Sequence, residues 1–211
     1  MSPAVNPKTG RVIYREISLD PAIVTASWQA GLTGGTLGGG YQGAAAAITK
    51  ASFAPPVVRP FMEIKLDEAD AATAGARKIN DPVSPNLDRF RAHGGKIIYY
   101  HGTGDQILSY QDTVDYVEAL QKRYGHQTGS FARFFSVPGM LHCAGGNGLT
   151  NFDPLTSIVD WVEKGKAPDR IVAGNAQERP GETRPLCPYP SYATYDGRGD
   201  PKRADSYSCK K

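Results

Sequence analysis

Apolar and polar residues follow their most regular patterns between positions 96 and 165. The apolar run at 96–100 is typical of a strand buried in a parallel sheet, and the run at 131–137 predicts a second such strand. Between them, apolar residues recur at helical spacing and predict a helix over 112–124 that ends at Gly125. The inward stripe of this helix is Val114, Val117 and Leu120.

A second helix is expected after the second strand. The Asp153-Pro154 pair is typical of a helix start, and Gly165 of a helix end. Its expected inward residues are Leu155, Ile158, Val159 and Val162. Strand, helix, strand and helix at these spacings predict a βαβα unit with right-handed crossovers, which places the chain in the α/β class.

The other segments before the tail have weaker patterns. Residues 1–56 are rich in glycine and alanine and have little periodicity. A helix is expected over 68–78. A short helix is predicted over 84–91, with Pro85 at its first position and a pair of glycines ending it.

Composition and charge argue against several classes of function. The chain has 211 residues and a net charge of +3, and its Lys and Arg residues are scattered, so no nucleic-acid-binding patch is expected. No apolar run approaches the ~20 residues of a membrane span. Residues 1–10 lack the pattern of a signal peptide. The expected partner is a small molecule.

Two short segments carry the candidate chemistry. His101-Gly-Thr-Gly-Asp105 follows the first predicted strand, and Pro138-Gly-Met-Leu-His142 follows the second. An acid and then a histidine at neighbouring strand ends is the order of the last two members of a Ser–Asp–His triad in α/β-hydrolases. Asp105 is therefore a candidate triad acid and His142 a candidate general base. Taken singly, Asp105 also fits a turn and His142 an ordinary loop histidine.

The nucleophile of such a triad has no clear candidate. The sequence contains no Gly-x-Ser-x-Gly, and no serine before Asp105 lies on a plausible strand–turn–helix elbow. Gly34-x-Thr36-x-Gly38 would place threonine in an elbow, but its methyl group crowds the turn and a preceding strand is missing. We therefore expect that this chain does not perform the reaction alone.

Other motifs are less specific. Gly38-x-Gly40-x-x-Gly43 matches a dinucleotide-binding fingerprint, but 26–31 is a poor strand to precede it. A dinucleotide-binding oxidoreductase fragment stays open as an alternative. His101 is expected to make a structural hydrogen bond near Asp105. No two histidines have metal-ligand spacing, so no metal site is expected, and no cofactor is expected in this chain.

Three cysteines form an odd set. Cys187 and Cys209 bracket a segment rich in Pro, Gly and Tyr that has almost no aliphatic residues and cannot bury a core of its own. A disulfide there would add on the order of 3 kcal/mol of stability. The alternative is three reduced thiols in a cytosolic protein, which leaves this tail without support.

Several motifs resemble the tannase/feruloyl esterase family. They are Pro-Gly-Met-x-His-Cys at 138–143, His-Gly-x-x-Asp at 101–105, Arg-Pro-Leu-Cys-Pro-Tyr-Pro at 184–190, and Asn-Pro-Lys-Thr-Gly at 6–10. The resemblance implies the C-terminal portion of an α/β-hydrolase fold with part of a lid insertion and a disulfide-stapled tail. It also implies a secreted serine esterase that acts on esters of aromatic or phenolic acids.

The resemblance assigns roles and also shows departures. Asp105 matches the triad acid and His142 the general base, while Cys143 matches a cysteine whose partner precedes the nucleophilic serine. The nucleophile segment, the oxyanion loop and the calcium-binding loop of the lid have no counterpart in this sequence, so Cys143 is expected to be unpaired. Gln106 stands where a proline usually follows the acid.

These expectations divide the chain into three parts. Residues 1–56 would be a lid remnant, 57–175 the C-terminal part of a hydrolase core, and 176–211 the tail. The expected function is that of a carboxylic ester hydrolase fragment that is inactive alone and poorly soluble. A catalytically dead module that binds an ester or a partner is the remaining alternative.

Overall fold

The computed structural model describes residues 3–16, 20, 52–53, 55–56, 63–81, 84–142, 144–175 and 177–211. The glycine-rich stretch with Thr36 and the dinucleotide-like motif at 38–43 lies outside these residues. Cys143 also lies outside them, as does most of the expected lid remnant.

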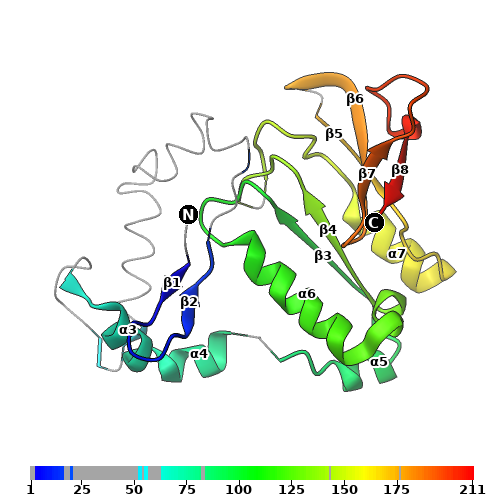
Figure 1. The fold of residues 1–211 in the computed structure, drawn as a ribbon. Coiled ribbons are helices and arrows are strands. Elements are labelled where there is room, and N and C mark those ends of the chain that lie inside the picture. Colours follow the sequence, from blue (N-terminus) through cyan, green and yellow to red (C-terminus); the bar gives the residue numbers. More distant parts are fainter. Residues whose placement is uncertain are drawn as a thin grey trace.

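The centre of the described fold is a pair of parallel strands with a connecting helix (Figure 1). Strand β3 (Ile97–Gly102) pairs with β4 (Ala132–Val137), and the register runs from Ile97–Ala132 to Gly102–Val137. Helix α6 (Tyr110–Tyr124) joins them, and α7 (Pro154–Lys164) follows. The predicted strand–helix–strand–helix order is therefore confirmed.

The two helices cover opposite faces of the strand pair. Neighbouring residues of a strand point to opposite faces, so Phe134 and Arg133 identify the two sides. Phe134 packs against α6 through Val114 and Val117, as the spacing predicts, whereas Arg133 lies over the indole of Trp161 in α7. Both faces of β4 are thereby covered, which explains why apolar residues occur on both of them.

The face of β4 opposite α6 contributes to the larger core cluster. Phe135 and Val137 are fully buried there, against Met140 and the hairpin that follows α7. That hairpin is β5 (Ile171–Asn175) and β6 (Arg179–Leu186), which pair antiparallel. Burying each large side chain contributes about 1.5–3 kcal/mol, so this cluster fixes the position at which β4 ends.

Helix α7 begins and ends as predicted but presents a different face. The Asp153 carboxylate accepts the Thr156 amide at 2.9 Å, and Gly165 closes the helix with φ 67°. Of the expected inward residues only Ile158 is half-buried, because the indole of Trp161, 3% exposed, takes the inner stripe. Leu155, Val159 and Val162 are exposed by 71%, 39% and 62%. The larger indole buries more area and sets the rotation of the helix.

Two further helix predictions need correction. The predicted 84–91 helix begins later, as α5 (Asp88–Ala92), because Ser84 and Asn86 accept hydrogen bonds from amides two residues on and form turns instead. The predicted 68–78 helix is two helices, α3 (Leu66–Ala72) and α4 (Ala74–Asn80). They meet at Thr73, whose hydroxyl donates to the Ala69 carbonyl.

The first residues form a hairpin that the weak pattern does not predict. Strands β1 (Ala4–Val5) and β2 (Val12–Tyr14) flank a turn in which the Asn6 side chain accepts two backbone amides. The buried Asp70 of α3 accepts a hydrogen bond from the Asn6 amide group at 2.6 Å and pairs with Arg77 at 3.0 Å. These polar contacts dock the hairpin on α3 and α4.

The tail is ordered and closed by the expected disulfide. Strands β7 (Tyr192–Tyr195) and β8 (Tyr207–Lys210) pair antiparallel, and Cys187 is bonded to Cys209 with a Cα separation of 5.6 Å. The tail also covers one edge of β4, because the Tyr189 amide donates to the Phe134 carbonyl at 2.7 Å. Short 3-10 helices complete the described elements at Gly125–Ser130 (η4) and Ala204–Ser206 (η5). No helix in the described ranges is long and apolar enough to span a membrane.

Candidate active site

Two loops meet beyond the carboxyl ends of β3 and β4. We call residues 103–109 the acid loop and residues 138–149 the histidine loop. The Thr103 amide donates to the Val137 carbonyl at 3.1 Å, and the Gly104 amide donates to the Met140 carbonyl at 3.0 Å. Gly102 permits this approach, since a side chain there would collide with the Met140 carbonyl. Parallel pairing and a glycine thus bring the loops into contact, at the edge where α/β sheets place their sites.

Asp105 and His142 lie within hydrogen-bond distance across these loops. The Nδ1 atom of His142 is 2.9 Å from Oδ2 of Asp105, the contact that a triad acid makes with its base. Asp105 is 4% exposed, whereas the His142 side chain is 32% exposed. The carboxylate favours the tautomer with a proton on Nδ1. Nε2 of His142 makes no hydrogen bond with any described residue, so its lone pair can accept a proton.

The Asp105 carboxylate is held by the backbone of its own loop. Its Oδ1 atom accepts the Ile107 amide at 2.8 Å and the Leu108 amide at 2.9 Å. Burial raises the pKa of this carboxyl, but the surrounding N–H groups outweigh burial and lower the pKa to about 2. These groups belong to His101, Leu108, His142 and Ile107. Asp105 is therefore a carboxylate at neutral pH.

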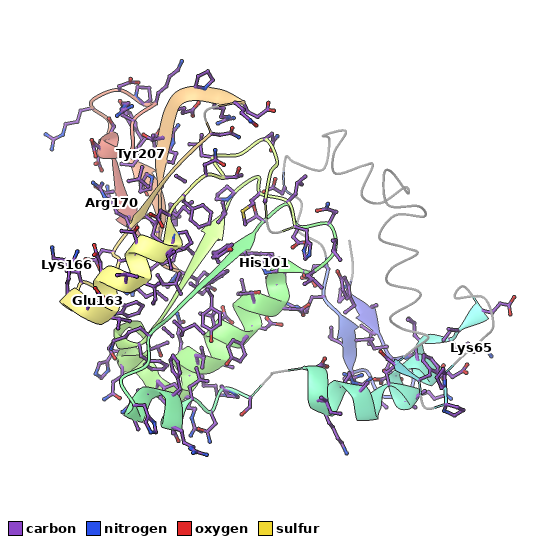
Figure 2. All side chains as sticks on the ribbon, turned by 180° about the vertical axis from the view of Figure 1, so that it is seen from behind. Lys65, His101, Glu163, Lys166, Arg170 and Tyr207 are labelled. Carbon is purple, nitrogen blue, oxygen red and sulfur yellow. A yellow bond between two sulfur atoms is a disulfide. The ribbon has the colours of Figure 1, made fainter. Side chains whose placement is uncertain are left out.

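A second imidazole reaches the same carboxylate. His101 lies near the end of β3, beside the first turn of α6 (Figure 2). Its Nδ1 atom is 2.7 Å from the Thr113 hydroxyl, and its Nε2 atom is 3.2 Å from Oδ2 of Asp105. The Nε2 contact does not have the alignment of a regular hydrogen bond, but at 3.2 Å it still contributes to the low pKa of Asp105. His101 thus lies where the sequence places it, near the acid loop.

Gln106 makes a hydrogen bond to the histidine loop that a proline could not make. The residue is 5% exposed, and its Oε1 atom accepts a hydrogen bond from the backbone amide of His142 at 3.3 Å. The residue that departs from the resembled pattern therefore supports the loop that carries His142. The sequence marks Gln106 as unusual but gives no sign of this contact.

Residues near the N-terminus, which no sequence pattern indicates, make hydrogen bonds to both loops. Asp20, 6% exposed, accepts a hydrogen bond from the Thr103 hydroxyl and another, at 3.1 Å, from the Gly139 amide. The Tyr14 hydroxyl donates to the Ile107 carbonyl, and the Ser109 hydroxyl donates to the Glu16 carbonyl at 2.6 Å. Residues so distant in sequence, in a segment without periodicity, carry no pattern that would reveal these contacts.

The other candidate features lie apart from this pair. His93 directly follows α5 and precedes β3, and His126 lies in η4 and precedes β4, so both lie before the amino ends of the strands and not beyond their carboxyl ends. No group of three or more His, Cys, Asp or Glu side chains in the described ranges could hold a metal. Cavities of about 550 Å³, between α6 and the tail, and about 400 Å³, beside the base of the histidine loop, are not lined by Asp105 or His142.

Comparison with known proteins gives a consistent result. The family model described as tannase and feruloyl esterase matches residues 36–210. Mono(2-hydroxyethyl) terephthalate hydrolase of Piscinibacter sakaiensis is 48% identical over 132 residues, covering 60% of this chain and 21% of that protein. An uncharacterised esterase of Xanthomonas campestris is 30% identical over 254 aligned positions, covering 97% of this chain and 43% of that protein.

Solved structures show the same fold. The crystal structure of feruloyl esterase B from Aspergillus oryzae has a TM-score of 0.81 at 22% identity, covering 99% of this chain and 44% of that one. Tannin acyl hydrolase from Aspergillus niger has a TM-score of 0.57 at 23% identity, covering 74% and 30%. This chain therefore has the fold of part of these α/β-hydrolase-type proteins and spans less than half the length of each.

Proposed function

The chain belongs to the tannase and feruloyl esterase family, and on this premise we propose that it supplies the acid and the base of a Ser–His–Asp carboxylic ester hydrolase. One observation carries the proposal. Nδ1 of His142 lies 2.9 Å from Oδ2 of Asp105, just beyond the carboxyl ends of two adjacent parallel strands. The other ring nitrogen, Nε2, has no hydrogen-bond partner among the described residues.

Each residue has a defined part in this reaction. Nε2 of His142 takes the proton from a serine hydroxyl as that oxygen attacks the ester carbonyl, and it later returns the proton to the leaving alcohol. Asp105 keeps the ring in the required tautomer and stabilises the imidazolium that forms. Its low pKa supports this role, because the carboxylate stays charged throughout the neutral range.

We propose that the serine is not part of these 211 residues and that the chain is inactive alone. No Gly-x-Ser-x-Gly is present, and the family's nucleophile segment has no counterpart in the sequence. Without the serine the oxyanion donor that follows it is also missing, and loss of a triad serine alone costs about a millionfold in turnover.

The proposed substrates are esters of aromatic acids. The names of the relatives support this class, since they refer to terephthalate and feruloyl esters. We also propose that the parent protein is secreted. The disulfide between Cys187 and Cys209 supports an oxidising compartment.

A chimera tests the triad roles. The segment of the Piscinibacter hydrolase that is 48% identical to this chain is replaced by the corresponding residues of this chain, and hydrolysis of an aromatic ester is measured. The chimera should be active. In it, His142→Ala should lower the turnover number about a millionfold and Asp105→Asn about 10⁴-fold. His126→Ala, in a histidine outside the two loops, is the matched control and should leave activity unchanged.

The isolated chain provides the second arm of this test. The purified chain and its His142→Ala variant should give the same background rate on an aryl ester. A rate that His142→Ala removes would reveal a nucleophile within this chain, and Thr36 would be substituted first. An active chimera that tolerates His142→Ala would overturn the assigned roles.

A further inference from the structure

Two imidazoles converge on one carboxylate oxygen in this site. Oδ2 of Asp105 is 2.9 Å from Nδ1 of His142 and 3.2 Å from Nε2 of His101. The other oxygen of the carboxylate, Oδ1, is already occupied by two backbone amides of the acid loop. A triad of the ordinary kind requires only one of these imidazoles, so the second needs a separate explanation.

The surroundings of His101 indicate where its proton lies. Its side chain is 13% exposed, and its Nδ1 atom is 2.7 Å from the Thr113 hydroxyl. A lone pair on Nε2 would face the Asp105 carboxylate at 3.2 Å and be repelled by it. An N–H group at the same place is attracted, so Nε2 carries a proton and Nδ1 accepts the hydrogen bond from Thr113.

We infer that His101 is a positioning residue for the candidate triad, a second N–H group on Oδ2 of Asp105 that shares the carboxylate charge with His142. The inference rests on the proposed function of Asp105 and His142. Thr113 is its support, because the hydroxyl on α6 fixes the orientation of the His101 ring.

Other polar and charged groups near His101 do not supply this contact. The Tyr110 ring packs edge-on against the imidazole at 6.1 Å. Asp112 lies on the same turn of α6 as Tyr110, and burial raises the pKa of its carboxyl. Tyr14 approaches Asp105 from the N-terminal segment. Of these, none places an N–H group toward Oδ2.

The inference predicts two linked effects of removing the His101 N–H. Oδ2 would then interact with His142 alone, so the hydrogen bond from His142 Nδ1–H would strengthen. The pKa of Asp105, about 2 in the native protein, would rise toward 3.8 because one stabilising donor is lost. If His101 only filled space, its removal would not both strengthen the His142 hydrogen bond and raise the pKa of Asp105.

Nuclear magnetic resonance on the full chain can measure both effects without any ester. The four histidines permit assignment of the ring protons, and the side-chain carboxyl carbon of Asp105 reports its titration. In His101→Phe the His142 Nδ1–H resonance should move downfield and the Asp105 pKa should rise. His101→Gln, whose amide can place an N–H near the position of Nε2, should restore native values. Thr113→Val should give intermediate values, and His126→Phe should give native ones.

Each outcome decides the inference. Native values in His101→Phe, or equal values in His101→Phe and His101→Gln, would overturn it. If His101→Phe fails to fold, the Gln and Thr113→Val variants still test the shared N–H, and native values in Thr113→Val would then overturn it. Asp105→Asn separates the two proposals, because a His142 resonance unaffected by that change would refute the triad pair itself.

Discussion

Removal of the disulfide tests how the tail is held to the rest of the fold. The perturbation is the double substitution Cys187→Ala and Cys209→Ala. Cys187 follows β6 and is 4% exposed, and Cys209 pairs with Ala193 between β8 and β7. The bond therefore ties the last hairpin to the segment that covers the edge of β4.

The magnitude follows from the length of the closed loop. The cysteines are 22 residues apart in sequence. Closing a loop of this length lowers the entropy of the unfolded chain enough to stabilise the fold by about 3 kcal/mol. With an unfolding slope of about 2 kcal/mol per molar urea, the midpoint should fall by about 1.5 M.

The assay is urea unfolding followed by tryptophan fluorescence, to which the buried Trp161 contributes, together with amide hydrogen exchange. The Tyr189 amide, bonded to the Phe134 carbonyl, should exchange faster in the variant because the tail is released from β4. Amides within the β3–β4 pair should be less affected. Ser191→Ala is the matched control, because Ser191 lies in the loop that the bond closes and, among the described residues, makes only a backbone hydrogen bond, to the Pro188 carbonyl.

Two results would refute this reasoning. One is a decrease of less than about 1 kcal/mol in the unfolding free energy of the double variant, because loop-closure entropy predicts a larger decrease. The other is unchanged unfolding of the native chain after a reductant has opened the bond, as verified by a thiol count.

Three other changes have expected outcomes. Asp105→Asn should destabilise the chain by about 2 kcal/mol at neutral pH, because the native pKa of about 2 lies below the ordinary 3.8. The difference in unfolding free energy between the two proteins should reach its full value above pH 3.8 and disappear as pH falls through about 2. Acid unfolding curves of both proteins check this. Gly102→Ala should cost about 1–3 kcal/mol in urea unfolding, since its methyl group meets the Met140 carbonyl, and Gly129→Ala, with open space around it, should cost much less. Leu155→Glu with Val162→Lys should raise the soluble yield, because both side chains lie on the exposed apolar face of α7; an unchanged yield would contradict this.

Local pattern was sufficient for the central elements, and together with the family resemblance it identified the residues of the candidate pair. The apolar runs predict β3 and β4, and the spacing of Val114, Val117 and Leu120 predicts α6 and its buried face. Asp105 and His142 could be paired because parallel strands bring their carboxyl ends to one edge. These features depend on residues that are close in sequence or on a general rule of sheet topology.

Tertiary contacts decided the rest. The rotation of α7 depends on where the Trp161 indole fits, and the start of α5 depends on side-chain turns that compete with a helix. Asp20 braces both loops and Gln106 holds the His142 amide through single hydrogen bonds between distant segments. A single polar residue leaves no periodicity in the sequence, because its role depends only on which groups the folded chain places beside it.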